Sequence, residues 1–181
     1  MSNIVIINTG NGNFLSVKRA VEKFNKNVKI SHDPKEIISA SKIILPGVGA
    51  FKDSVSFLKK NKIFEIIKEI SNQKPILGIC LGMQLLFENS NEFGFCDGLN
   101  LIQGNIKPLP NQKIDEFNYK IPNIGWYNLE NNSKNFKYFD EKKDDFYFIH
   151  SFYAKDVKEL VGKDLRGEIN SNISYEEDFV K

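Results

Sequence analysis

A chain of 181 residues is long enough for one domain with a substantial core and too short for two full domains. Its 25 basic and 23 acidic residues nearly balance at a formal net charge of +2, which argues against nucleic acid or a membrane surface as the main partner. Two cysteines are too few for a disulfide framework, no apolar run is long enough to span a membrane, and the N-terminus lacks a signal-peptide pattern, so we expect a reducing cytoplasmic location.

Strand-like apolar runs alternate with helical patterns through the first half of the chain. Strands are predicted at 4–7, 28–30, 43–45 and 76–79, and helices at 14–24, 34–38, 55–58 and 63–70. This alternation predicts a parallel sheet packed against helices. Ligands bind beyond the carboxyl ends of the strands in such sheets, so loops 8–13 and 46–51 and the surroundings of Cys80 should line one crevice.

The second half of the chain has a different residue pattern, with polar loops and aromatic-rich runs. Residues 89–98 are polar and predict a loop, 100–109 contain a short predicted strand, and 131–145 form a charged excursion expected at the surface. Aromatic-rich runs around Trp126 and at 146–152 predict strands, partly antiparallel, with Trp126 and the phenylalanines in the core. We therefore predict an α/β fold, one domain whose mostly parallel central sheet is flanked by helices and has an antiparallel section in its second half.

A cysteine lies where a predicted strand meets a helical pattern, in the stretch Gly78-Ile79-Cys80-Leu81-Gly82. The two glycines suit a tight turn that pushes the thiol out of the sheet, as in the nucleophile elbow of Gly-x-Ser-x-Gly hydrolases. The Leu81 N–H would face an oxygen held by Cys80, and the N-terminus of a helix expected through Phe87 would favour the thiolate. The alternative is a buried structural cysteine, with glycines needed only for the turn.

The loop Pro46-Gly47-Val48-Gly49 directly follows its predicted strand. Its glycines allow the backbone to approach a ligand, and its N–H groups are candidates for the second donor of an oxyanion hole with Leu81. A tight turn without a ligand explains the same residues equally well.

Other motifs in the sequence are incomplete. Gly10-x-Gly12 followed by Asp33 is part of a dinucleotide-binding fingerprint, but Leu15 occupies the third glycine position, so an NAD-dependent oxidoreductase is an alternative that a cofactor titration tests. The position of His150 at the end of a predicted strand nominates it as a base for the cysteine, while His32 is expected at the surface. No cluster has metal-ligand spacing, and we expect neither a metal nor a cofactor.

Taken together, several ordered blocks resemble the class I (triad type) glutamine amidotransferases, and within them the glutaminase subunits of imidazole glycerol phosphate synthases. The most specific block is Gly78–Phe87, which reads Gly-Ile-Cys-Leu-Gly-Met-Gln-Leu-Leu-Phe. The other blocks are 10–17, 45–51, 98–104, 122–126 and 147–153. The resemblance covers essentially the whole chain and implies that residues 1–181 are one glutamine amidotransferase type 1 domain.

The resemblance implies that glutamine is hydrolysed at the nucleophile Cys80 through a glutamyl thioester. Ammonia would be channelled to a cyclase or synthase subunit, the partner in a heterodimer of histidine biosynthesis. The oxyanion hole implied by the family comprises Val48, Gly49 and Leu81. The implied glutamine-binding residues are Gly47, Gln84, Glu92, His150, Ser151 and Phe152. Glu92 suits the ammonium group of the substrate, although a solvated loop carboxylate is the alternative.

Three features depart from the family pattern. The triad His and Glu of the family lie in a C-terminal His-Pro-Glu segment that the sequence does not contain, so we expect a truncated chain, a poor glutaminase and an exposed sheet edge. Since His150 matches the glutamine-binding block, the resemblance argues against it as the triad base. The other departures are Asn123, where histidine is usual, and Asn8-Thr9, where Asp-Tyr is common.

Two further functions therefore stay open. One is a glutaminase partner of a nucleotide-sugar amidotransferase in surface-glycan synthesis. The other is a non-catalytic interaction subunit that keeps the fold and lacks a complete triad.

Overall fold

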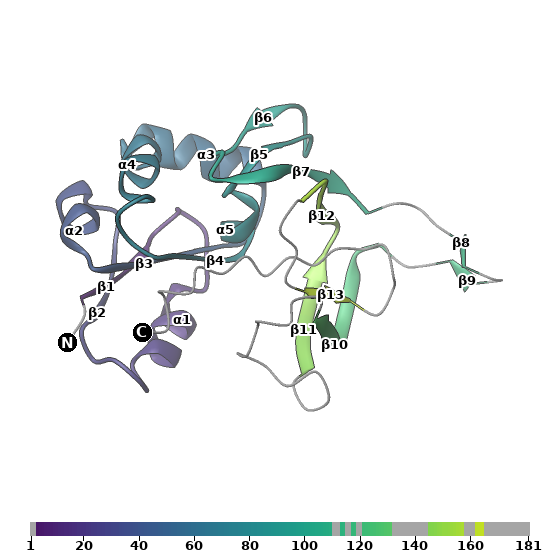
Figure 1. The fold of residues 1–181 in the computed structure, drawn as a ribbon, viewed down its shortest axis with the longest axis horizontal. Coiled ribbons are helices and arrows are strands. Elements are labelled where there is room, and N and C mark those ends of the chain that lie inside the picture. Colours follow the sequence, from purple (N-terminus) through teal and green to yellow (C-terminus); the bar gives the residue numbers. More distant parts are fainter. Residues whose placement is uncertain are drawn as a thin grey trace.

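The computed structural model describes residues 3–109, 113–114, 117–118, 121–131, 145–157 and 162–164. Its central sheet has parallel strands in the order β2-β1-β3-β4 (Figure 1). These strands are β1 (Ile4–Ile7), β2 (Val28–Ser31), β3 (Lys42–Gly47) and β4 (Ile76–Cys80). Every residue of β1 is buried, as expected for a strand covered on both faces, and the parallel sheet predicted for the first half is confirmed.

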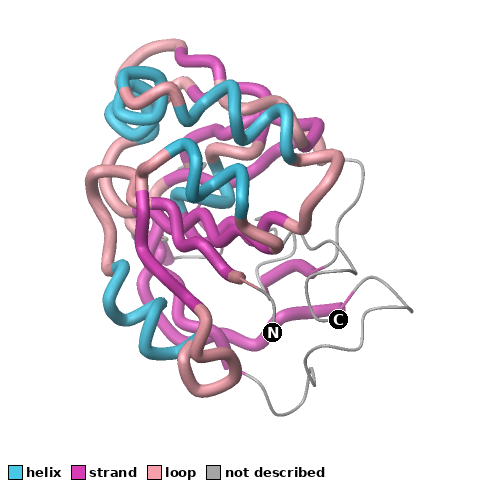
Figure 2. Tube along the Cα trace, turned by 90° about the vertical axis from the view of Figure 1, so that its left-hand side faces the viewer, coloured by secondary structure: helices cyan, strands magenta, loops and turns pink. Residues whose placement is uncertain are grey.

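Helices cover both faces of this sheet (Figures 1 and 2). Helix α1 (Phe14–Val21) packs on one face, over a small cluster that contains the even-numbered residues of β1. Helices α2 (Pro34–Ser39), α3 (Phe51–Lys60) and α4 (Ile63–Ile70) pack on the other, over the main core, which contains its odd-numbered residues. Because successive strand residues face opposite ways, the single run Ile-Val-Ile-Ile contributes to both cores.

A second sheet, of mixed direction and order β12-β7-β5-β6, extends the main core. Its strands are β5 (Phe87–Ser90), β6 (Cys96–Asp97), β7 (Ile102–Pro108) and β12 (Phe152–Lys155). Phe87, Ile106 and Ala154 are buried and belong to the same hydrophobic cluster as the α3 and α4 side chains. This second sheet therefore shares the hydrophobic core on the face of the parallel sheet that α2, α3 and α4 cover.

The predicted antiparallel section is a third sheet, β11-β10-β13, which Figure 1 shows to the right of the parallel sheet. It consists of β10 (Asn123–Asn131), β11 (Asp145–His150) and β13 (Gly162–Asp164). A short hairpin pairs β8 (Lys113–Ile114) with β9 (Phe117–Asn118). Of the surface loop expected at 131–145, the residues 132–144 lie outside the described part of the chain. Among the described residues, no helix has the length and apolar character needed to cross a membrane.

The helix expected to run from Cys80 through Phe87 is much shorter. Helix α5 (Leu81–Gln84) is a single turn, and Phe87 begins β5. The residues after the turn, Leu85 to Phe87, are all buried in the main core. A continuous buried run has no polar face, so its periodicity does not distinguish a helix from a strand, and the prediction was wrong here.

Several aromatic residues expected in the core lie at the surface instead, and these include Phe93 and Phe95, which are 81% and 65% exposed. Trp126 is 68% exposed, so its assignment to the core was wrong, and Phe24 is 93% exposed because α1 ends at Val21. Aromatic content predicted the strand around Trp126 correctly, but it does not tell which face of a strand is covered.

Replacement of Gly82 by alanine should destabilise the fold severely, because the added Cβ would overlap the backbone carbonyl oxygen of Leu45. We expect the free energy of unfolding to fall by about 3 kcal/mol or more. The matched control is Gly94→Ala, where the Cβ meets open space and only the positive φ of 99° is strained, at a cost of about 1 kcal/mol. Urea unfolding followed by circular dichroism measures the free energy of unfolding of both variants. Equal losses of stability in the two variants would contradict the close contact of Gly82 with Leu45.

Candidate active site

The strand-to-helix junction has the geometry of the expected elbow. Cys80 ends β4 with φ 55° and ψ −118°, a positive φ that is uncommon outside glycine and concentrates at functional sites. A Cβ on Gly78 would lie 2.5 Å from Cα of Met83, and one on Gly82 would overlap the Leu45 carbonyl. The two glycines thus allow α5 to fold back against β4 and β3, which turns Cys80 outward.

The thiol of Cys80 is accessible but not activated. The residue is exposed, yet desolvation by the surrounding protein raises the pKa of its thiol, and a hydrogen bond with the Leu81 backbone N–H offsets only part of that rise. The expected preference for thiolate is therefore not met in this structure, where α5 is a single turn. The Leu81 N–H lies at the sulfur, next to the atom that a substrate carbonyl carbon would have to approach.

The glycine-rich loop after β3 lies beside the cysteine. Gly47 pairs with Cys80 in the register of β3 and β4, which brings the ends of both strands together. Gly49 has a φ of 94° and an exposed backbone. The Val48 N–H donates to the carbonyl of Asn11 at 3.4 Å, so in this structure it points toward loop 8–13.

A buried hydroxyl joins these two loops. Thr9 is 1% exposed, and its Oγ1 contacts the carbonyl of Asn11 at 3.1 Å and that of Pro46 at 3.3 Å. This hydroxyl therefore links the end of β1 to the end of β3 by hydrogen bonds, as expected for neighbouring strands. Thr9 was noted in the sequence only as a departure from the family pattern, and nothing there indicated this contact.

Glu92 lies at the start of α3 rather than in solvent. Its Oε2 accepts a hydrogen bond from the Phe51 backbone N–H at 2.7 Å, and Ala50, the residue at the N-cap, makes no side-chain capping bond. A carboxylate is stabilised at a helix N-terminus, so Glu92 caps this helix. The contact brings Glu92 to the end of the loop that begins at Pro46.

The remaining candidates for glutamine binding meet at one carbonyl. Gln84 Nε2 lies 3.5 Å and His150 Nδ1 lies 2.9 Å from the carbonyl oxygen of Phe152. Ser151 occupies the bend between β11 and β12, where its carbonyl accepts from the Leu109 N–H at 2.8 Å. The structure thus connects α5, which starts beside Cys80, to the His150-Ser151-Phe152 segment.

The other sequence motifs have structural explanations. His32 is exposed and meets the Phe57 ring edge-on, with 6.5 Å between ring centroids. Asp33 caps α2 by accepting from the Lys35 N–H, which accounts for the carboxylate of the incomplete dinucleotide fingerprint. His150 contacts Phe152 and Asn123 through its two ring nitrogens, and within the described residues neither histidine is hydrogen-bonded to Cys80.

The described part of the chain also contains no group of three or more His, Cys, Asp or Glu residues placed to hold a metal ion. One residue that sequence reasoning did not assign to the site is Asn123. It is 1% exposed and bonded to His150, and only its departure from the family pattern had singled it out.

Comparison with known sequences gives consistent matches along most of the chain. The model of the family "Glutamine amidotransferase class-I" matches residues 5–168. An "Imidazole glycerol phosphate synthase subunit HisH" from Sulfurimonas denitrificans is 40% identical over 179 residues, 96% of this chain and 85% of the relative. The subunit "HisH 1" from Campylobacter jejuni is 42% identical over 161 residues, 87% of this chain and 78% of the relative. The subunit "HisH 1" from Legionella pneumophila (strain Paris) is 40% identical over 161 residues, which are 85% of this chain and 76% of the relative.

A solved structure described as "Crystal structure of glutamine amidotransferase" has a similar fold. Its TM-score is 0.67 at 14% sequence identity, and the match covers 92% of this chain and 82% of the other. At this identity the likeness shows the fold, and it agrees with the predicted α/β architecture.

The alkylation of Cys80 should require a higher pH than that of a free thiol. Because desolvation raises its pKa, the thiolate that reacts forms only as the pH rises past the value of about 8.5 typical of free cysteine. The rate with iodoacetamide, followed from pH 6 to 10 by mass spectrometry, should reach its midpoint above that of glutathione measured alongside. A midpoint at or below that of glutathione would contradict the raised pKa.

Proposed function

The chain belongs to the class I glutamine amidotransferase family, and from this membership we propose that it is the glutaminase subunit of an imidazole glycerol phosphate synthase, acting in histidine biosynthesis. The observation that carries the proposal is the exposed thiol of Cys80 on a strand-to-helix turn of positive φ. Residues 1–181 act as one glutamine amidotransferase domain in a cytoplasmic enzyme.

In the proposed reaction, the sulfur of Cys80 attacks the side-chain amide carbon of glutamine. The C–S bond forms as the carbonyl oxygen becomes an oxyanion, the proton of the Cys80 thiol passes to the amide nitrogen, and the C–N bond then breaks to release ammonia. Water hydrolyses the resulting glutamyl thioester to glutamate and restores the thiol. The hydrogen bond between the Leu81 N–H and the Cys80 sulfur supports the proposal that this N–H donates to the oxyanion.

The second oxyanion donor is proposed to come from Val48 or Gly49. The Val48 N–H is engaged with the Asn11 carbonyl at 3.4 Å, a long hydrogen bond that has to be exchanged before this group donates to an oxyanion. Of the two proposed donors, the Leu81 N–H is beside the sulfur and the Val48 N–H is bonded to Asn11. We therefore expect the resting activity to be low until a partner subunit is bound.

Residues on both sides of Cys80 are proposed to hold glutamine. Glu92 would accept from the substrate ammonium group, because its carboxylate is already fixed by the Phe51 N–H and retains further lone pairs. Gln84 and the segment His150-Ser151-Phe152 would hold the opposite side, and Gly47, which pairs with Cys80 in the sheet, would contribute its backbone. The short hydrogen bonds of Glu92 and His150, 2.7 and 2.9 Å long, hold these two side chains before substrate arrives, whereas Gln84 makes a longer contact of 3.5 Å.

The relatives are named as subunits, and we propose that this chain likewise pairs with a cyclase or synthase subunit, to which ammonia passes. The exposed face of β10 and β11 is the proposed docking surface. Its apolar side chains are Ile124, Trp126, Tyr147 and Ile149, which are 52 to 68% exposed. Ile124 pairs with Ile149 and Trp126 with Tyr147 across the two strands, with 5.4 Å between the two aromatic rings, so they form one continuous patch.

Labelling by a glutamine-like electrophile tests the proposed function. The diazoketone 6-diazo-5-oxo-norleucine should modify Cys80 selectively and saturably, and glutamine should protect it, because the pocket recognises the amino-acid portion of the reagent. Intact-mass and peptide mass spectrometry on the full chain provide the measurement.

Cys96 is the internal control, since it is partly exposed and its pKa is also raised by desolvation. The variant Cys80→Ser should take up no label. Absence of labelling, or equal labelling of both cysteines, would contradict a glutaminase site and favour a non-catalytic subunit.

Replacement of Trp126 by alanine should weaken partner binding without loss of stability. The side chain is 68% exposed, so folding depends little on it, whereas a central aromatic residue at an interface typically contributes a factor of about 30 or more in affinity. Titration of the partner synthase subunit, followed by calorimetry, measures the change.

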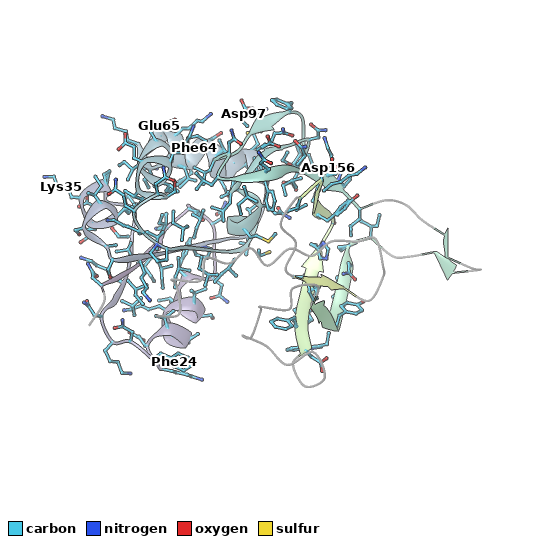
Figure 3. The ribbon with its side chains drawn as sticks, viewed as in Figure 1. Phe24, Lys35, Phe64, Glu65, Asp97 and Asp156 are labelled. Atoms are coloured by element: carbon cyan, nitrogen blue, oxygen red, sulfur yellow. The ribbon has the colours of Figure 1, made fainter. Side chains whose placement is uncertain are left out.

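The matched control is Phe24→Ala, which removes an aromatic side chain that is 93% exposed and lies beyond α1, apart from β10 and β11 (Figure 3). If both variants bind the partner as the unchanged chain does, the β10–β11 face is not the docking surface.

A further inference from the structure

We propose that Asn123 is a positioning residue that fixes the proton of His150 on Nδ1 and thereby holds the His150-Ser151-Phe152 segment in its glutamine-binding conformation. The inference deepens the proposed function, because it concerns how one side of the same site is set. Asn123 itself is not placed in contact with the substrate or with Cys80.

The first step concerns where Asn123 lies. It is the first residue of β10 and pairs directly with His150, the last residue of β11. Its side chain is on the face opposite the exposed apolar patch, and the residue is 1% exposed. A buried amide is costly unless it is hydrogen-bonded, so its partners hold it in one orientation.

The second step assigns the proton of His150. Asn123 Nδ2 lies 3.1 Å from Nε2 of the ring, and an amide nitrogen can only donate, so Nε2 accepts. In the neutral ring the proton is then on Nδ1, which lies 2.9 Å from the Phe152 carbonyl oxygen and donates to it. Both contacts are satisfied by one tautomer, and the opposite tautomer satisfies neither.

The third step concerns the link between the Phe152 carbonyl and the region of Cys80. The same oxygen lies 3.5 Å from Nε2 of Gln84 in α5, the turn that begins beside Cys80. One carbonyl thus receives a hydrogen bond from the His150 side and a longer one from the Gln84 side. If the His150 bond is lost, the longer contact with Gln84 is the remaining side-chain hydrogen bond to this carbonyl among the described residues, so the carbonyl is held less firmly relative to Cys80.

A purely structural role for Asn123 makes a different prediction. A residue that only fills a buried polar position affects stability and leaves the tautomer of His150 and the affinity of the pocket unchanged. The tautomer and the affinity are therefore the readouts that separate the two roles.

The tautomer is measured in the full chain by nitrogen-15 NMR of the histidine rings. The sequence contains two histidines, so the variant His32→Gln leaves His150 as the single signal. We expect a protonated Nδ1 and an unprotonated Nε2. A neutral ring with its proton on Nε2 would overturn the proposal, and this measurement needs no substitution at Asn123.

The affinity is measured by the concentration dependence of Cys80 labelling with 6-diazo-5-oxo-norleucine. In Asn123→Leu and Asn123→Ala the amide that donates to Nε2 is removed, so it no longer holds the proton of His150 on Nδ1. In both variants we expect the half-saturating reagent concentration to rise roughly tenfold, with little change in the maximal labelling rate, because binding rather than the nucleophile is affected.

Asn61→Leu is the matched control, because it removes an asparagine amide that donates to the Phe57 backbone carbonyl at the end of α3 and not to a histidine ring. It should leave the labelling unchanged. Variants at Asn123 that fold, as judged by thermal melts, and label like the unchanged chain would overturn the proposal. Failure of the unchanged chain to label saturably would instead refute the proposed function, while the tautomer measurement still decides the role of Asn123.

Discussion

The site depends on one backbone contact, the approach of Gly82 to the carbonyl of Leu45. A side chain at position 82 would overlap that oxygen, so only glycine lets α5 begin directly against β3. The same approach keeps Gly47 paired with Cys80 and presents the Leu81 N–H to the sulfur. Cys80 adopts its positive φ as a consequence, at a cost of about 1 to 3 kcal/mol that the burial of the apolar residues following it offsets.

The sequence predicted those parts of the fold in which one pattern has one structural meaning. The β-branched run of β1 could only be a buried strand, and glycines on both sides of Cys80 could only serve a tight turn. The run from Leu85 to Phe87 is apolar throughout, and both a helix and a strand bury such a run, so only the packing of the second sheet decides. Trp126 is ambiguous for a similar reason, because a strand residue can face either the core or a surface.

The candidate site was predictable in its residue types but not in its contacts. Family resemblance named Glu92 and His150, yet the partners of these residues come from distant parts of the chain. Glu92 bonds to a residue 41 positions away, and Asn123 bonds to one 27 positions away. No local pattern encodes such pairs, because they arise from the register of strands and the packing of separate sheets. The capping role of Glu92 illustrates this, since no capping residue precedes α3 in the sequence.

The polar contacts that restrain the site differ in length, and the difference has a functional meaning. The bonds of Glu92 to Phe51 and of His150 to Phe152 are 2.7 and 2.9 Å, whereas those of Val48 to Asn11 and of Gln84 to Phe152 are 3.4 and 3.5 Å. Long hydrogen bonds are weak and cost little to exchange. The carboxylate and the histidine are thus held firmly, while the oxyanion loop and Gln84, which flank the nucleophile, are the groups that can rearrange when substrate or a partner subunit binds. Under the proposed roles, Glu92 and His150 are held before glutamine binds, whereas Gln84 and the Val48 N–H change their hydrogen bonds on binding.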